Sequence, residues 1–536
     1  MAPPAVPYAD TAHFPRPQVR SFSEIWDMVE TTVFAPATRT LNVPRRIDRA
    51  DGRGREARDL NAWDDVENSS WFEHRNDLTP IAADAMRRGP GAHGPPAPTG
   101  LLLIVAPKPS GVTPGFRVQD ERGVRYLFKF DPPDAPELAS GAEAIATRLV
   151  HAVGYYTSEA YVTVFDPARL RIDNSAKVRD ADGRERPMTQ ADVDAVLARA
   201  AHLPDGRIRA LASWWIPGRR GAFKWTGLRL DDPNDRVPHQ HRRELRGFFV
   251  ISAWMNHVDA RRGNTFEQWV GDSAGGYIRH LMQDVSSTLG SGSDRIQTPY
   301  DGGETTVDYP HIAGRALSLG LYRAPWERLD TALADSAVGW FSGRGFDPGG
   351  WMPLRPNPAF EERTNRDGYW GAKLVASFTD EQLRAAVAAG EYSRPAASDA
   401  IVRALIERRD ATVRYWFARV TPIEHLVARC EGRDLVVEFE DNGIRHGAAR
   451  AEDTRYAADL VHGAAAVRRN VVARAGEPLR LADALPPEGF SPGDDHDRVA
   501  RLTVRAERAG RLAPPATVYL LYEPATHCYR VAGLAH

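Results

Sequence analysis

The chain has 536 residues, 42% of them hydrophobic and 26% charged, which is typical of a globular protein with more than one domain. Its formal net charge of −2 and the lack of a convincing basic patch argue against nucleic-acid binding. No run of about 18 apolar residues is present, so we expect no membrane span. The first residues lack the pattern of a secretory leader, which leaves the compartment open between the cytoplasm and export after removal of a leader. Cys430 and Cys528 allow one disulfide, and no Cys/His cluster suggests zinc.

Residues 1–98 are rich in Pro, Arg, Asp and Gly and end in the Gly-Pro-rich stretch 89–98. This composition predicts an irregular extension that wraps a folded body or stays partly disordered.

From Gly100 the sequence alternates in the manner of strands, and Gly154 ends a helical pattern. The expected order is three strands, a helix and two strands: 101–106, 115–120, 124–130, then helix 137–153, then 161–165 and 208–216.

Past Pro238 a long helix is expected up to about Asn256, followed by strands 265–270 and 277–283 around a Gly-rich turn. We expect residues 310–425 to be largely helical. The short alternating segments of 433–536 predict a small β-rich accessory domain.

Lys129 lies between Phe128 and Phe130 in an expected strand, so its side chain points to the face opposite both rings. A buried ammonium is costly unless it is paired, and a compact cation suits a phosphate oxygen. The chain has only five lysines among 69 basic residues, which makes a lysine here conspicuous. The alternative is an edge-strand lysine that faces water.

Glu143, in the helix that follows, is the expected partner of Lys129. Glu137, at the start of the same helix, competes for this role, although an acid there also favours the helix dipole.

The segment His257–Asn264 follows the long helix and precedes a strand. Asp259 and Asn264 are five residues apart, so one carboxylate and one amide can face the same phosphate and metal. Arg261 can reach a transferred phosphate, and we interpret His257 as a brace of the loop. The alternative is an ordinary polar helix end.

Asp284 follows the strand that pairs back from the Asn264 loop, at a position suited to a metal ligand. The alternative is a turn aspartate. His239 and His241 precede the long helix, and we interpret them as a helix-start pair rather than as metal ligands.

Together these segments resemble the protein-kinase-like superfamily, whose marks are a strand lysine, a helix glutamate, a His-x-Asp-x-(Lys/Arg)-x-x-Asn loop and a metal aspartate. The resemblance covers about residues 100–300. It implies that Lys129 holds phosphates and pairs with Glu143, that Asp259 is the catalytic base, and that Arg261 contacts the γ-phosphate. Asn264 and Asp284 would hold Mg²⁺ or Mn²⁺ with ATP.

More narrowly, residues 110–116, 231–235 and 286–291 are similar to a group of bacterial kinase-like proteins. The short first lobe and the unusual loops look closer to the HipA-like and spore-coat CotH-like atypical kinases than to eukaryotic kinases.

The resemblance also assigns nucleotide contacts and shows departures from the family pattern. Ser110, Gly111 and Gly115 would form the phosphate loop, which lacks the Gly-x-Gly-x-x-Gly pattern, and Trp215 would lie at the hinge beneath adenine. Asp284-Val285-Ser286 lacks the usual Phe and Gly, and no Ala-Pro-Glu anchor for peptide substrates is visible.

The expected fold class is α+β, a two-lobed protein-kinase-like fold with a small antiparallel sheet and one helix in the first lobe and a mainly helical second lobe. The expected divisions are an extension (1–98), the first lobe (99–217), the second lobe (218–430) and the accessory β domain (431–536). The expected function is transfer of the ATP γ-phosphate to a protein hydroxyl or a small molecule. The alternatives are a nucleotide-binding pseudokinase or scaffold, a nucleotidyl transferase, and an α+β binding protein unrelated to kinases.

Overall fold

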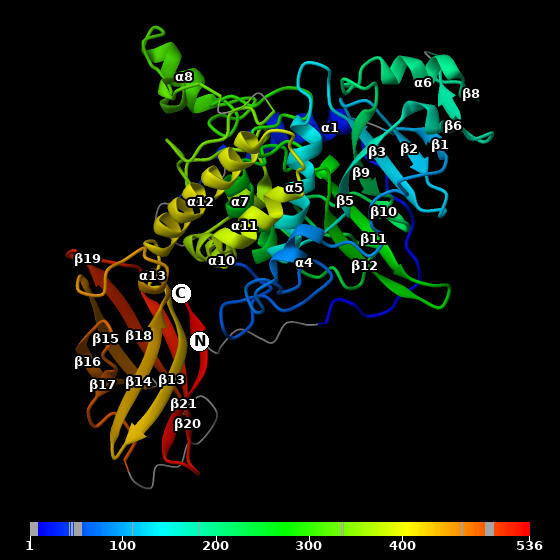
Figure 1. Ribbon diagram of the computed structural model, residues 1–536. Helices are drawn as coiled ribbons and strands as arrows, with labels where there is room; N and C mark the ends of the chain where they lie inside the picture. The colour runs from blue at the N-terminus through cyan, green and yellow to red at the C-terminus, as the bar shows by residue number, and fades with distance from the viewer. Residues whose placement is uncertain are drawn as a thin grey trace.

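The computed structural model describes residues 9–41, 43, 47, 56–109, 111–180, 182–333, 335, 337–462, 465–487 and 498–536 (Figure 1). Helices make up 28% and strands 26% of the structure, so the expected mixture of both is confirmed. Within the described ranges, no helix is long and apolar enough to cross a membrane.

A six-stranded sheet has the order β5-β9-β3-β2-β1-β6. Its strands are β1 (Leu102–Pro107), β2 (Gly115–Gln119), β3 (Arg125–Phe130), β5 (Ala160–Phe165), β6 (Leu170–Ile172) and β9 (Ile208–Trp214). The five expected strands are confirmed, but the short strand β6 was missed and pairs in parallel with β1. The sheet is therefore not purely antiparallel as expected.

One face of this sheet holds an aromatic core, while Lys129 points to the other face. Phe116, Phe128 and Phe130 are buried in the core with Phe165. The hairpin β7 (Lys177–Arg179) and β8 (Glu185–Pro187) and the helix α6 (Gln190–Leu197) form an insertion between β6 and β9, and Val193 of α6 joins the core.

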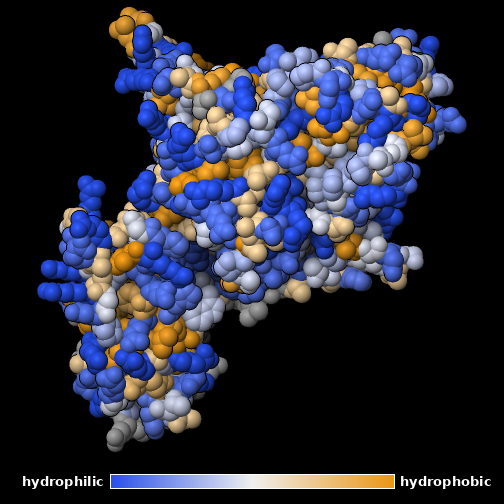
Figure 2. Space-filling model, viewed as in Figure 1, coloured by the Kyte–Doolittle hydropathy of each residue, from blue (hydrophilic) through white to orange (hydrophobic). Residues whose placement is uncertain are grey.

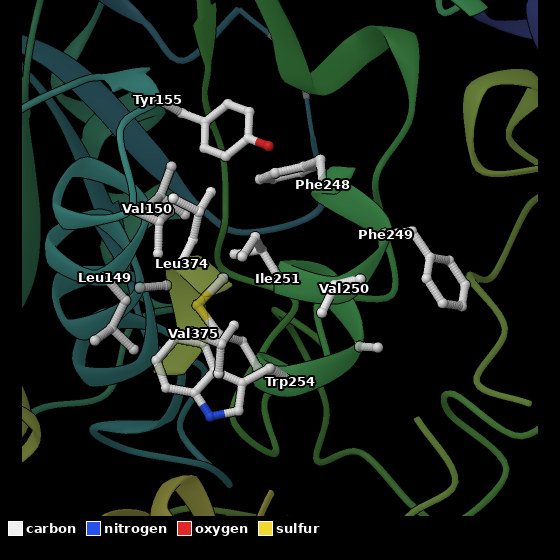
Figure 3. Close-up of a cluster of buried hydrophobic side chains, with 14 of the residues drawn as sticks. Leu149, Val150, Tyr155, Phe248, Phe249, Val250, Ile251, Trp254, Leu374 and Val375 are labelled. Carbon is white, nitrogen blue, oxygen red and sulfur yellow. The ribbon is translucent and has the colours of Figure 1, made fainter. Parts of the chain in front are cut away.

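The helix α5 (Leu138–Ala152) packs against strands β5 and β9 of the six-stranded sheet. Its first turn is fixed by Asp131, whose carboxylate accepts hydrogen bonds from the backbone of Glu137 and Ser140 at 3.1 and 2.8 Å. Its far end packs through Leu149 and Val150 against α7 (Arg243–Met255) and α10 (Asn365–Ala376), as Figure 3 shows.

The helix α7 is buried along its whole length, and α10 packs against it very closely. A Cβ atom on Gly247 would lie 2.4 Å from the ring of the buried Trp370. α9 (Pro358–Glu361) and α12 (Pro395–Phe417) also pack against α7, and α11 (Asp380–Ala388) packs against α12.

The expectation of a largely helical 310–425 is wrong for its first part. α8 (Tyr309–Leu317) protrudes from the body, and residues 318–357 contain only the 3₁₀ helix Pro325–Arg328 among the described residues (Figure 1). Frequent Gly and Pro in 318–357 explain the difference, because they terminate helices. The last residue of α8 and two leucines just after it are 85–92% exposed, and the tip of this protrusion is apolar in Figure 2: Leu317, Leu319 and Leu321.

A second sheet has the order β10-β11-β12-β4 and lies beneath the first. Its strands are β10 (Arg219–Gly221), β11 (Thr265–Gly271), β12 (Gly276–Met282) and β4 (Tyr156–Thr157). The expected hairpin of β11 and β12 is confirmed. Its register pairs Thr265 with Met282, so the residue before β11 and the residues after β12 meet at the same end of the hairpin.

The described part of the N-terminal extension is more ordered and more deeply buried than expected. It contains α1 (Glu24–Val29), the π-helical turn Glu30–Phe34, α2 (Ala35–Leu41) and α4 (Ala83–Arg88). Trp71 and Phe72 lie in the main core, because aromatic side chains in an otherwise polar segment bury their area wherever the body offers a surface.

Two facing sheets form the C-terminal β module. One contains β13 (Ile423–Glu431), β14 (Asp434–Asp441) and β17 (Leu479–Leu481), and the helix α13 (Asn442–Arg445) follows β14. The other contains β15 (Thr454–His462), β16 (Ala465–Arg474), β18 (Val499–Arg508), β19 (Arg511–Leu512), β20 (Ala516–Glu523) and β21 (Cys528–Ala535). The module begins at β13, several residues before position 431, and the possible disulfide Cys430–Cys528 is formed.

The close packing of α7 and α10 gives a stability test. We expect Gly247→Ala to lower the free energy of unfolding by about 1–3 kcal/mol because the added methyl overlaps Trp370. Gly314→Ala in α8 is the matched control, since its nearest neighbour lies 3.5 Å away and the change should raise stability by up to about 1 kcal/mol. Urea unfolding followed by tryptophan fluorescence measures both, and equal midpoints for the two variants would contradict the packing.

Candidate functional site

At the centre of the site, one ammonium is shared by two carboxylates. Lys129 Nζ lies 2.9 and 2.8 Å from the two carboxylate oxygens of Glu143 and 2.6 Å from Asp284 Oδ1. Lys129 and Glu143 are buried, whereas the Asp284 side chain is 39% exposed. The three residues come from β3, α5 and the turn after β12. The edge-strand alternative for Lys129 is therefore wrong.

The pKa shifts show which charges this cluster favours. Burial alone lowers the pKa of Lys129, but the carboxylates of Asp284 and Glu143 outweigh it and raise this pKa above its ordinary value. Burial raises the pKa of Glu143 despite Lys129, whereas Lys129 overcomes burial and lowers the pKa of Asp284. Asp284 is thus the ionised and accessible oxygen donor of the cluster.

Glu143, rather than Glu137, is the partner of Lys129. Glu137 precedes α5 in a left-handed conformation (φ 69°), and its carboxylate accepts a hydrogen bond from the backbone of Ser393. The sequence left Glu137 and Glu143 as candidate partners of Lys129, and the structure selects Glu143.

The loop after α7 folds around Asp259. Asn256 ends the helix in a left-handed conformation, and the chain then turns toward β11. Asn264 Nδ2 donates to Asp259 Oδ2 at 2.9 Å and to its carbonyl at 2.8 Å, and Arg261 Nε donates to the two carboxylate oxygens at 2.9 and 3.1 Å. The expected proximity of Asp259, Arg261 and Asn264 is confirmed.

His257 braces this loop, as interpreted from the sequence. It is buried, burial lowers its pKa, and its Nδ1 lies 3.3 Å from the carbonyl oxygen of Ser287. Val258 N also donates to Ser287 at 3.2 Å. The Asp259 loop and the turn after Asp284 are therefore held side by side.

The β11–β12 hairpin completes this arrangement. Gln283 N donates to the carbonyl of Asn264 at 3.0 Å, so Asn264 and Asp284 lie next to each other across the end of the hairpin. Asp284 has a left-handed backbone (φ 51°), and Ser286 Oγ donates to its Oδ1 at 3.0 Å. One carboxylate and one amide thus lie together, and both carry oxygen atoms of the kind that Mg²⁺ and Mn²⁺ prefer.

A cavity of about 140 Å³ lies between the two sheets beside Lys129. Its polar wall includes Lys129, Glu143 and Asp284, and its apolar wall includes Leu127, Trp214, Trp215, Ile216 and Phe266. Trp215 is held by a backbone hydrogen bond to Arg125 and lies under the guanidinium of Arg117 at 4.9 Å. An aromatic and aliphatic slot beside a charged cluster suits a flat apolar ring that carries anionic groups.

The glycines of the expected phosphate loop do not face the cavity. Ser110 lies outside the described residues. Gly111 has φ +89°, and Gly115 lies so close to the neighbouring strand that a Cβ atom would be 2.1 Å from the carbonyl oxygen of Phe128. Neither glycine lines the cavity, whereas Lys108 and Pro109 do.

Lys108 is the first residue of the expected phosphate loop, 108–115, but the sequence indicated no role of its own for it. Its Nζ donates to the hydroxyl and the carbonyl of Thr113 at 2.8 and 3.0 Å, which closes the loop on itself. Burial, together with the nearby Lys129, lowers its pKa from 10.5 to about 8. The signal was available, since Lys108 is one of five lysines and lies in the expected loop.

Phe22 and Glu24 of the N-terminal extension also line the cavity, and no sequence pattern indicated this. Glu24 reaches Arg261 at 3.4 Å.

The histidine pair before α7 is structural, as interpreted from the sequence. His239 lies 2.8 Å from Asp235 and also contacts the carbonyl of Lys224, and His241 lies 2.8 Å from the guanidinium of Arg246. In the described part of the chain, no group of three or more His, Cys, Asp or Glu side chains is arranged to hold a metal.

No protein-family model matches the chain, and no curated protein matches it. Among solved structures, it is similar to the Helicobacter pylori proinflammatory kinase CtkA at 11% identity, over 59% of this chain and 97% of that one, with a TM-score of 0.31. The Golgi casein kinase is similar at 9% identity over 74% of this chain and 93% of that one, and its structure with Mn/ADP bound over 74% and 95%, both with a TM-score of 0.31. Both neighbours are kinases, but a TM-score of 0.31 is too low to identify a family.

The lowered pKa of Lys108 gives a chemical test. Its neutral, nucleophilic form grows as the pH rises through about 8, so its acylation should rise with a midpoint near that value. Lys129, buried and with a raised pKa, should stay unmodified, and the exposed Lys177 serves as the reference. Peptide mass spectrometry after brief treatment with acetic anhydride between about pH 6 and 10 measures each lysine separately. Equal labelling of Lys108 and Lys129 across this pH range would contradict both the lowered pKa of Lys108 and the burial of Lys129.

Proposed function

We propose that this chain is an ATP-dependent phosphotransferase of the atypical kinase type, with residues 99–217 and 218–430 as the two lobes of a protein-kinase-like domain. The observation that carries the proposal is the buried Lys129 shared by Glu143 and Asp284 at one cavity, beside the loop that joins Asp259 to Asn264. These are the parts that ATP chemistry needs: a cation for the phosphates, an acid that fixes it, oxygen ligands for a metal, and a carboxylate for the acceptor.

In this proposal the nucleotide base occupies the slot beside Trp215, and its phosphates extend toward Lys129. Lys129 binds the α- and β-phosphates as a compact cation, and Glu143 fixes its position. Since Lys129 donates to both carboxylates in the structure, binding of the phosphates replaces the contact to Asp284 and retains the contact to Glu143. Asp284, released from Lys129, would hold the metal together with Asn264.

Asp284 and Asn264 fit a hard divalent cation such as Mg²⁺ or Mn²⁺. When bound, the metal neutralises the charge on the phosphate oxygens.

The remaining residues orient the acceptor. Asp259 accepts the proton of the acceptor hydroxyl. The hydroxyl oxygen bonds to the γ-phosphorus while the bond from the γ-phosphorus to the bridging oxygen of ADP breaks. Arg261, which donates a hydrogen bond to Asp259 in the structure, stabilises the transferred phosphoryl group in this proposal. The acceptor is a protein hydroxyl or a small molecule.

Nucleotide binding is the first test. ATP with Mg²⁺ or Mn²⁺ should stabilise the folded chain by ~2.7 kcal/mol at a hundredfold excess over the dissociation constant. Asp284→Asn should remove the metal-dependent part of this stabilisation, because it removes the charge that holds the metal. Asp272→Asn, the same change at an exposed turn of the β11–β12 hairpin, is the matched control. Thermal unfolding with and without each metal measures the effect, and no stabilisation by millimolar ATP would reject the nucleotide site.

Turnover is the second test. We expect Asp259→Asn to lower kcat by about 10²–10⁴-fold while the affinity for ATP changes little, because the carboxylate acts on the acceptor and not on the nucleotide. Two assays measure kcat: release of ADP, and transfer of labelled phosphate to the chain itself or to a mixture of test proteins that offer Ser, Thr and Tyr hydroxyls. Nucleotide binding without any turnover, both in the unmodified chain and in a variant with Glu24→Gln, Asp27→Asn and Glu30→Gln, would identify a pseudokinase instead.

A further inference from the structure

The N-terminal extension lies along the candidate site as a strap, defined here as residues 14–34. It starts at the β11–β12 hairpin, where Phe14 and Gly276 form an antiparallel β-bridge. Phe14 N donates to the carbonyl of Gly276 at 2.9 Å, and Gly276 N donates to the carbonyl of Phe14 at 3.2 Å. Arg229 then donates to the carbonyl of Gln18 at 2.9 Å, and Arg20 pairs with the buried Glu267 at 2.8 Å. These contacts lead the chain along the second sheet to the Asp259 loop.

At that loop the strap turns an acidic face inward. Glu24, Asp27 and Glu30 follow at intervals of three residues, so they lie along one side of a helical segment. Glu24 lies 3.4 Å from Arg261, Asp27 lies 4.0 Å from Arg262, and Glu30 lies 3.8 Å from Lys224. Each acid of this face meets a cation of the body.

The outward side of the same segment is apolar. Ile25 is 74% exposed and Trp26 60%, and Val33 and Phe34 are also exposed. This is the reverse of the usual amphipathic helix, which buries its apolar side. Charge pairs therefore contribute most of the contacts that residues 24–34 make to the body, whereas Phe14 and Phe22 add aromatic contacts to Trp269 and Arg262.

The surface beneath the strap, here called the basic floor, consists of Lys224, Arg261, Arg262 and Arg355. A cavity of only about 50 Å³ remains between the floor and the strap. Burial raises the pKa of Asp27, and Arg262 and the other floor cations oppose this rise. Phe22 packs on Arg262, with the guanidinium 4.4 Å from its ring centre.

The floor adjoins both parts of the candidate site. Arg261 contacts Asp259 on one side and Glu24 on the other, so any chain on the floor lies beside the proposed base. Phe22 and Glu24 also line the neighbouring cavity of about 140 Å³, which is smaller than the roughly 300–1,000 Å³ of most small-molecule sites. The strap thus contacts the loop that carries Asp259 and forms part of the wall of the cavity beside Lys129.

We propose that the basic floor binds an acidic peptide segment as the acceptor, and that strap residues 22–31 occupy it in cis and inhibit the enzyme. The acceptor role rests on the proposed phosphotransferase function, whereas binding of an acidic peptide does not depend on ATP. An acceptor segment with carboxylates at three-residue spacing displaces the strap by competing for the same cations.

Peptide binding to the full chain tests the floor. The probe is a fluorescent synthetic peptide with the sequence of residues 20–35, and its neutral counterpart carries Gln, Asn and Gln at the three acidic positions. The strap variant combines Glu24→Gln, Asp27→Asn and Glu30→Gln. It should bind the acidic probe at least about tenfold more tightly than the unmodified chain, because the competing strap is weakened.

The charge controls separate binding at the floor from general attraction. The variant Glu438→Gln, Asp453→Asn, Glu452→Gln removes the same charge from exposed sites in the β module and should bind like the unmodified chain. Adding Arg262→Gln and Lys224→Gln to the strap variant should abolish the gain. Affinity should fall as salt rises.

Either of two results would overturn the proposal: equal affinity of the strap variant for the acidic and neutral probes, or no gain over the unmodified chain when thermal unfolding shows that both are folded. The peptide affinity is measured by fluorescence anisotropy without nucleotide. A negative peptide result therefore does not contradict ATP binding, and absence of ATP binding does not contradict peptide binding at the floor. Where both hold, the strap variant should also phosphorylate acidic peptides faster than the unmodified chain does.

Discussion

The site depends on the position of one buried positive charge. A buried ammonium is unfavourable without partners of opposite charge. Lys129 has two such partners, Glu143 of α5 and Asp284 of the turn after β12. Removing one partner of such a pair typically costs 3–5 kcal/mol. The pairing therefore requires the sheet, the helix and the hairpin to occupy fixed relative positions. Those positions also place Asp284 beside Asn264 and the Asp259 loop.

Charges alternate outward from that centre. Lys129 is surrounded by carboxylates, the loop beyond them presents the arginines of the basic floor, and the floor is covered by the acids of the strap. Each contact at the outer level is partly exposed, so it is weak and sensitive to salt. In the proposed mechanism the buried Lys129–Glu143 pair is retained, whereas the contact of Lys129 to the partly exposed Asp284 and the outer pairs are exchanged for other anions. This difference in burial separates the residues that build the site from those that control access to it.

The extension is nevertheless not an accessory to the fold. Buried Arg243 at the start of α7 lies between Asp64 of the extension, at 2.8 Å, and Asp367 of α10, at 3.0 Å. Arg243 overcomes burial and holds the pKa of Asp64 well below its usual value, and His536 from the last strand region also contacts Asp64 at 3.1 Å. One network thus ties the extension, the helix that carries the Asp259 loop, and the β module together. Residues 56–72 support the platform on which the site is built, while residues 14–34 cover it.

The sequence by itself determined the local parts of this protein. The period-two pattern around Lys129, the helix that carries Glu143 and the Asp259–Asn264 spacing are short-range features, because alternation and helical periodicity act between near neighbours. Only the tertiary structure decided how remote parts meet. Lys108 turns inward because a loop closes through Thr113, and the strap reaches Arg261 across 237 residues of sequence. The parallel strand β6 also depends on the packing surface that the body offers. Such contacts leave no periodic trace in the chain, since the energy that selects them comes from charges and surfaces that only the folded state brings together.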